Sequence, residues 1–216
     1  MVDGMSSTLE ASVTAPSDHT VLFYERDRFL SECVAGYLRE GLAEDRDVMV
    51  IATAPHLRAF DALLERPAWQ GGGDARLTIL DAHDTLEELL RDDVLDLGRL
   101  RERVEPWLAA ANRSGREPRI YGEMVALLWD DSQFERAVQL EALWNRLGRS
   151  FSFSLLCGYP MRGFGDHAGG DGFLDVCRQH SAVTTESYSR LRDEREGPGS
   201  MVVLDGGSPG GHIHLD

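Results

Sequence analysis

The chain has 216 residues, of which 42% are hydrophobic, and this length and composition suit one globular domain with a full core. Its formal net charge is -15 and all 22 basic residues are arginine, which argues against nucleic-acid binding and against docking on anionic membranes. No apolar run approaches the roughly 18 residues of a membrane-spanning helix, and no signal-peptide pattern is evident. We therefore expect a cytoplasmic protein whose three cysteines are reduced.

The two ends of the chain differ in composition from its middle. Residues 1–17 are small and polar, and residues 193–216 are rich in Gly, Ser, Pro and acidic side chains. Both compositions are typical of disordered tails, because they bury too little apolar surface to offset the entropy of ordering. The sequence therefore predicts a single domain over residues 18–192.

Between these tails, strand-like and helix-like segments alternate along the chain. Strands separated by helix-length segments indicate right-handed crossovers and an α/β domain of three layers around a mainly parallel sheet. Apolar runs predict five strands, at His19–Tyr24, Val48–Ala52, Leu77–Leu80, Ile120–Tyr121 and Phe153–Cys157. Apolar residues at helical spacing predict helices at Phe29–Leu38, His56–Leu64, Thr85–Leu90 and Leu97–Ala111, a helix pair before the fifth strand, and a last helix at Phe173–His180.

A phosphate-binding loop is missing after the first strand. Such a loop needs a glycine-rich backbone and a lysine that holds the β- and γ-phosphates. The residues at this position are Tyr24-Glu25-Arg26-Asp27-Arg28, whose carboxylates repel a triphosphate, and the chain contains no lysine. The glycine-rich stretch Gly163–Gly172 also carries acids and lacks a basic residue at a helix entry, so we expect a loop there.

Two acidic residues occupy positions that allow either a structural or a functional role. Glu123 follows the fourth strand and begins a helix, where the helix dipole favours a carboxylate, so a structural role and a ligand or switch role both remain open. Glu141 shares a helical face with Ala137, Trp144 and Asn145, and this face is expected to point into the core. A buried carboxylate must be paired or protonated. We expect either a structural network with Asn145 or an arginine, or a polar contact in a ligand pocket.

The cysteines and histidines allow, but do not require, chemistry. Cys157 is expected where the fifth strand ends, and with His180 it has the residue types of a nucleophile and its base, although a buried cysteine in a central strand more commonly only packs. His19, His56 and His83 lie at or near strand ends and could converge, but no two histidines of the domain have a short metal-ligand spacing. The sequence therefore predicts no metal site, no catalytic residue and no cofactor.

Several motifs together resemble the MEDS family, a sensory domain named from methanogens, methylotrophs and a dichloromethane-responsive regulator. The most specific combination is Gly122-Glu123-Met124 with Leu140-Glu141 and the Trp144-Asn145 that follows. The matching segments together cover nearly all of residues 18–190: His19–Glu25, Gly41 with Val48–Thr53, Gly122–Trp129, Leu140–Asn145, Ser154–Pro160 and Cys177–Ser181.

This resemblance implies a RecA/KaiC-like fold without a functional phosphate loop, and a non-catalytic sensory or regulatory role. Relatives are often joined to kinase, anti-sigma-factor or DNA-binding modules, so it also implies a regulatory protein partner, with homo-oligomers left open. We expect a small, mostly apolar, hydrocarbon-derived ligand at the carboxyl edge of the sheet. The predicted ligand-binding residues combine strand-end polar groups with aromatic side chains that are otherwise core residues: Tyr24, Glu25, Glu123, Trp129, Glu141, Asn145, Cys157 and Tyr159.

Two other functions remain open. A degenerate nucleotide-binding protein would use Arg26 or Arg28 in place of the absent lysine, and titration with ATP and GTP would detect it. A thiol-dependent hydrolase would use Cys157 and His180, and its thiol would alkylate faster than free cysteine at neutral pH.

Overall fold

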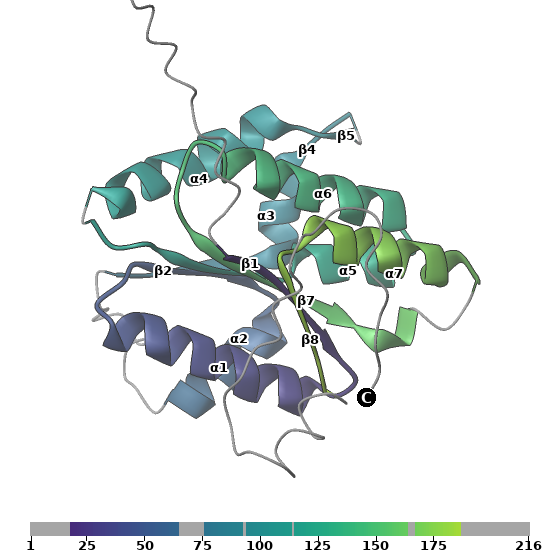
Figure 1. The fold of residues 1–216 in the computed structure, drawn as a ribbon, viewed down its shortest axis with the longest axis horizontal. Coiled ribbons are helices and arrows are strands. Elements are labelled where there is room, and N and C mark those ends of the chain that lie inside the picture. Colours follow the sequence, from purple (N-terminus) through teal and green to yellow (C-terminus); the bar gives the residue numbers. More distant parts are fainter. Residues whose placement is uncertain (1–17, 65–75, 93, 114, 164–166, 187–216) are drawn as a thin grey trace, which may run out of the picture.

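A six-stranded parallel sheet in the order β3-β2-β6-β7-β1-β8 forms the centre of the computed structural model (Figure 1). The structure describes residues 18–64, 76–92, 94–113, 115–163 and 167–186, so the tails predicted at residues 1–17 and 193–216 lie outside the described residues. The six strands are β1 (Asp18–Tyr24), β2 (Val48–Ala52), β3 (Leu77–Asp81), β6 (Arg119–Gly122), β7 (Ser154–Pro160) and β8 (Ala182–Thr185).

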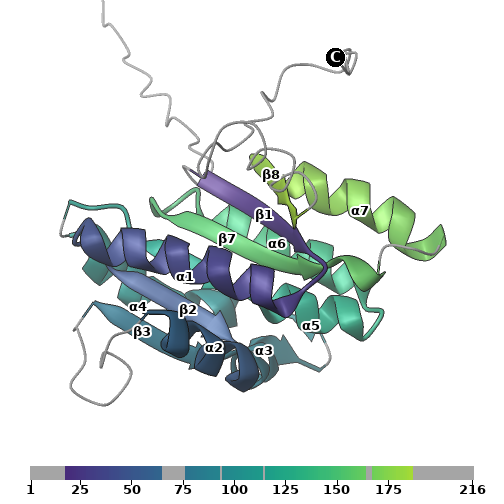
Figure 2. The ribbon, with the colours of Figure 1, turned by 90° about the horizontal axis from the view of Figure 1, so that it is seen from below.

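Helices cover both faces of this sheet, which confirms the predicted three-layer α/β class (Figures 1 and 2). One face carries α1 (Asp27–Ala43) and α2 (Ala54–Leu64), which lie in front of the sheet in Figure 2. The other face carries the remaining helices, α3 (Ala82–Leu89), α4 (Leu97–Asn112), α5 (Met124–Asp130), α6 (Phe134–Leu147) and α7 (His167–Gln179).

The central strands are apolar because both of their faces are covered. All five residues of β2 are buried, and so are the last six residues of β1 and of β7. Continuous apolar runs of this kind are typical of parallel strands between two helical layers. Along β1 and β7 the side chains alternate between the two cores: Val21, Phe23, Cys157 and Tyr159 lie under α5–α7, whereas Leu22 lies on the α1 side.

Three details differ from the sequence-based expectation. Strand β8 was not predicted, because Ala182–Thr185 is short and half polar and is stabilised by its pairing with β1. Cys157 lies inside β7, not at its end, because the strand continues through Pro160. The expected loop Gly163–Gly172 ends early, since α7 already begins at His167. A short hairpin of β4 (Leu90–Arg91) and β5 (Val94–Leu95) precedes α4.

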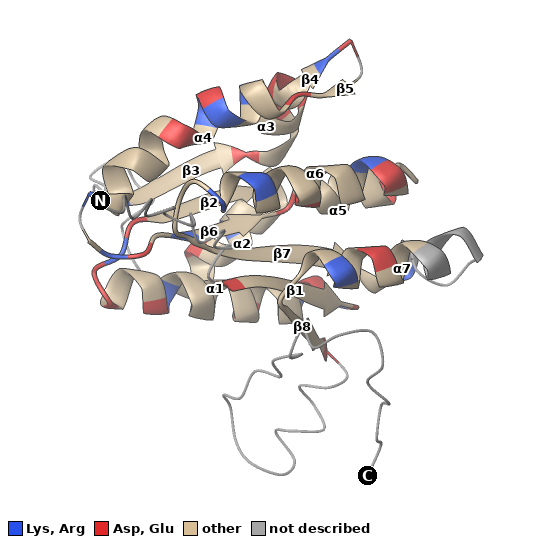
Figure 3. Cartoon of the chain, turned by 45° about the horizontal axis from the view of Figure 1, so that its top comes forward, with Lys and Arg blue, Asp and Glu red and all other residues tan. Residues whose placement is uncertain are grey.

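Charged residues lie mainly on the helices and the connecting loops (Figure 3). Three acidic side chains are nevertheless buried, since Glu123, Glu141 and Glu186 are at most 3% exposed. A buried carboxylate requires charged or hydrogen-bonding partners, so these three residues mark the places where the interior is polar. No helix in the described part of the chain combines the length and the apolar character needed to cross a membrane.

Candidate functional site

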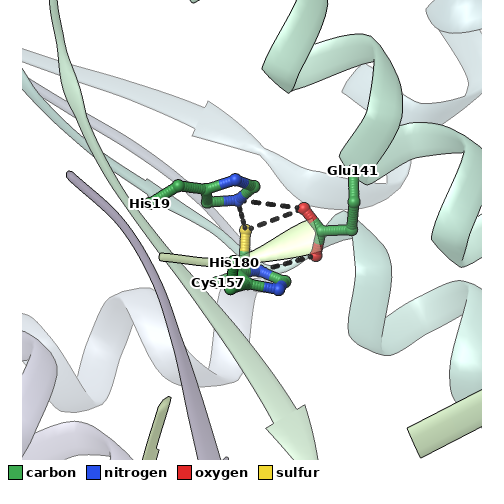
Figure 4. A group of neighbouring side chains, drawn as sticks. All are labelled: His19, Glu141, Cys157 and His180. Carbon is green, nitrogen blue, oxygen red and sulfur yellow. Dashed lines mark hydrogen bonds and ion pairs between the residues drawn. The ribbon is translucent and has the colours of Figure 1, made fainter. Parts of the chain in front are cut away.

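Four side chains with metal-ligating or acid–base chemistry meet in the core beneath α6 and α7. His19 comes from β1, Glu141 from α6, Cys157 from β7 and His180 from the residue after α7, and one donor atom of each lies within 4.8 Å of the others (Figure 4). All four side chains are at most 2% exposed. We call these residues the buried cluster.

Glu141 lies at the centre of the buried cluster. Its Oε1 accepts a hydrogen bond of 2.9 Å from the Tyr159 hydroxyl and lies 3.4 Å from His180 Nε2. Its Oε2 lies 3.2 Å from His19 Nε2 and accepts a contact of 3.4 Å from the Cys157 thiol. Cys157 Sγ is also 3.6 Å from His19 Nε2. The Glu141 carboxylate therefore contacts all three other residues of the buried cluster.

Outer hydrogen bonds fix the orientation of both imidazole rings. The amide nitrogen of Asn145 donates to the backbone and side-chain oxygens of Gln179, so the amide oxygen of Asn145 points to His19 Nδ1 at 2.9 Å. His180 Nδ1 lies 2.7 Å from the Val176 carbonyl oxygen. Since both Nδ1 atoms face acceptors, both carry the ring proton. In the neutral rings, each Nε2 then directs a lone pair into the cluster.

The charges of the buried cluster follow from its burial. Burial raises the pKa of Glu141, but His180 and then His19, when their Nε2 atoms carry protons, outweigh it and hold the pKa well below its usual value. Burial, and then the Glu141 carboxylate, raise the pKa of the Cys157 thiol well above its usual value. Glu141 is therefore ionised and Cys157 is a protonated thiol, which is unfavourable for a nucleophile.

A second polar group lies at the carboxyl ends of β2 and β6. The carboxylate of Glu123 accepts hydrogen bonds from the Thr53 backbone N–H at 3.2 Å and the Thr53 hydroxyl at 3.0 Å, and His56 Nδ1 lies 2.5 Å from it. Partial burial lowers the pKa of His56, but the hydrogen bond to Glu123 and its charge outweigh burial and leave the pKa raised. These contacts connect the two strand ends and give Glu123 a structural explanation.

A third carboxylate closes the corner between β1 and α1. Glu186 Oε2 accepts hydrogen bonds of 2.9 Å from the Glu25 N–H and 3.1 Å from the Arg26 N–H, and its Oε1 pairs with the Arg26 guanidinium. Arg28 is paired with Glu32 at 2.8 Å. Two backbone donors directly before α1, at the corner where a nucleotide-binding protein would hold a phosphate, are therefore satisfied from within the chain.

The eight predicted ligand-binding residues do not form one pocket at the sheet edge. Glu141, Cys157 and Tyr159 are in contact, and Asn145 joins them through His19 instead of binding Glu141 directly. Trp129 packs edge-on against Tyr159, with ring centroids 5.5 Å apart.

The other three predicted residues, Tyr24, Glu25 and Glu123, lie outside the buried cluster. Tyr24 is buried on the α1 side of the sheet, where burial, and then the charge of Glu123, raise its pKa. Glu25 is exposed. Two surface hollows, of about 470 and 160 Å³, are lined by residues 132–136 and by Arg39, Leu42, Ala43 and Leu64, and so by none of the eight.

Two possibilities that the sequence left open are not realised in the structure. Glu141 is paired with His19 and His180, not with an arginine. His19, His56 and His83 do not converge, because His56 binds Glu123 and His83 is exposed on the first turn of α3. Sequence reasoning missed His19 and His180 as partners of Glu141, since their sequence separations carry no motif.

The sequence matches a family model over most of its length. The model of the MEDS family, the methanogen/methylotroph, DcmR sensory domain, matches residues 18–181. The chain belongs to the MEDS family. The match includes all four residues of the buried cluster, so this cluster lies inside the MEDS domain.

Comparisons with individual proteins add less. No curated protein matches the chain. Among solved structures it is similar to a KaiC-like protein from the hyperthermophilic archaeon Pyrococcus horikoshii OT3, with 13% identity, a TM-score of 0.48, and coverage of 78% of this chain and 70% of that one. This likeness indicates neither a ligand nor an activity.

Proposed function

We propose that this MEDS-family protein is a non-catalytic, cytoplasmic sensory domain. It binds a small, hydrocarbon-derived ligand and passes its state to a regulatory partner protein in transcriptional or anti-sigma-type control. Family membership supports the sensory role. Cys33, Cys157 and Cys177 form no disulfide bond among the described residues, which suits the reducing cytoplasm.

The observation that carries the proposal is that the buried cluster connects α6 and α7 to the sheet. His180 follows α7 directly, and the neighbouring Ser181 exchanges hydrogen bonds with the backbone of His19 in β1, at 2.7 Å and 2.9 Å. The four side chains are covered, so a ligand can reach the cluster only if a covering element moves, and we propose that this element is α7 with its C-terminal end. A ligand that binds the opened state better than the closed one shifts the population, and this shift is the signal.

Neither alternative function has comparable support. The Cys157 thiol is fully buried and its pKa is raised, whereas a catalytic thiol needs access and a lowered pKa. Nucleotide binding at the β1–α1 corner would require Glu186 to leave the donors that it occupies.

The experiment is hydrogen exchange of the full chain with and without dichloromethane or methanol, two one-carbon probes. We expect a dose-dependent change in exchange over residues 172–186. Asn145→Ala, which removes the connection between His19 and Gln179, should abolish the change. Asp175→Asn is the matched control, because Asp175 is exposed on α7 and pairs with Arg178. An unchanged exchange pattern in the wild-type protein with both probes, or the same response in Asn145→Ala, would refute the proposal.

A further inference from the structure

We propose that His19, Glu141, Cys157 and His180 form a binding site for one divalent transition-metal ion of the zinc class. Glu141 Oε2 lies 3.2 Å from His19 Nε2 and 3.4 Å from Cys157 Sγ, and these two atoms are 3.6 Å apart. His180 Nε2 lies 3.4 Å from the other oxygen, Glu141 Oε1. A tetrahedral ion with bonds of about 2.0–2.3 Å separates its ligands by about 3.3–3.8 Å. His19 Nε2, Glu141 Oε2 and Cys157 Sγ are therefore already spaced as three corners of such a polyhedron. All four ligand atoms lie within 4.8 Å of one another, so a small adjustment of the side chains brings His180 Nε2 to the fourth corner.

The orientation of the imidazole rings is that of metal ligands. A ligating histidine donates its second ring N–H to a carbonyl, amide or carboxylate, which fixes the tautomer and directs the other nitrogen to the metal. His19 makes this bond to Asn145, and His180 makes it to the Val176 carbonyl. Both Nε2 atoms point toward Glu141 and Cys157 (Figure 4).

The cluster also needs positive charge at its centre. The buried Glu141 carboxylate needs a positive charge beside it in a site from which water is excluded, and with both Nε2 atoms unprotonated the four residues supply none. His180 Nε2 has no hydrogen-bond partner among the described residues, since its contact of 3.4 Å with Glu141 lies outside hydrogen-bonding geometry. A cation between the four ligand atoms supplies this charge and satisfies the His180 nitrogen.

The charges and the ligand atoms of the cluster together indicate a divalent ion of the zinc class. With a divalent ion bound, the Glu141 carboxylate and the Cys157 thiolate contribute two negative charges and the histidines remain neutral, so the site has no net charge. Binding releases the thiol proton of Cys157 to solvent, because a coordinating thiol is deprotonated. Two nitrogens, one sulfur and one oxygen disfavour calcium and magnesium, which take oxygen ligands, and favour zinc and its neighbours.

The test uses the full chain, freed of metal with a chelator and titrated with Zn²⁺ and Co²⁺. We expect one ion per chain, a tetrahedral Co²⁺ spectrum with a thiolate charge-transfer band, and proton release on binding. His180→Gln and Cys157→Ser should weaken binding by more than about 100-fold, since loss of an outer partner alone costs about 10–100-fold. His56→Gln and Cys33→Ser are the matched controls and should bind like the wild type, because both residues lie outside the cluster.

A second measurement keeps the proposal testable if a cluster variant does not fold. X-ray absorption of the zinc-loaded wild-type protein should give a first shell of one sulfur and three nitrogen or oxygen atoms. Absence of stoichiometric binding to the wild-type chain, or a first shell without sulfur, would overturn the proposal. Neither readout depends on the sensory role.

Discussion

Gly158→Ala tests the close packing between β7 and β6. A Cβ atom at Gly158 would lie 2.8 Å from the Tyr121 hydroxyl oxygen and 3.2 Å from Leu30 Cδ1. This hydroxyl is fully buried and has no hydrogen-bond partner among the described residues. Overpacking of this kind costs about 1–3 kcal/mol, so we expect Gly158→Ala to lower the free energy of unfolding by that amount.

Tyr121→Phe removes the obstructing atom and an unsatisfied polar group, and should raise the free energy of unfolding by about 1 kcal/mol. In the Tyr121→Phe background the cost of Gly158→Ala should fall below about 1 kcal/mol, because only the contact with Leu30 remains tight. Urea unfolding of the four proteins gives the coupling energy, provided that the m-value is constant. An equal cost of Gly158→Ala in both backgrounds would show that the hydroxyl is not the obstacle.

Three further predictions concern the buried polar groups. Glu186→Ala should lower the free energy of unfolding by about 1–3 kcal/mol, because two backbone N–H groups and an arginine lose their acceptor; urea titration measures it. The raised pKa of His56 means that its pair with Glu123 stabilises the fold below pH 6.5 and that this contribution is lost as the pH rises through the raised pKa. His56→Gln should therefore cost more stability at pH 5.5 than at pH 8.5, and equal costs would contradict the pairing. In the native protein, iodoacetamide should modify the half-buried Cys33 well before the buried Cys157, as mass spectrometry of timed samples would reveal.

The layered fold was predictable because apolar runs and helical periods are local signals. Four of the five predicted strands differ from the observed bounds by at most two residues at either end, and β7 extends further because Gly158-Tyr159-Pro160 does not look like a strand interior. Strand β8 has no such signal, since its apolar content is low and its pairing with β1 is a tertiary property.

The buried cluster was predictable only in part. The helical stripe of α6 correctly predicted that Glu141 points into the core. The partners of Glu141 come from β1, β7 and the end of α7, and no spacing along the chain reports which strands become neighbours. Of the two partners expected near Glu141, Asn145 lies beside it through His19, whereas the place of an arginine is taken by two histidines that the sheet order brings there.

The strand order has a consequence for how the protein is made. Strand β1 lies between β7 and β8, and Ser154 of β7 follows Tyr24 of β1 by 130 residues. At a synthesis rate of roughly 5–20 residues per second, β1 leaves the ribosome on the order of ten seconds before either neighbour exists. Its apolar run from Val21 to Tyr24 has no native strand to pair with during this time. Until then, chaperones or temporary contacts must cover this apolar run. Slow synthesis of the second half of the chain lengthens that period.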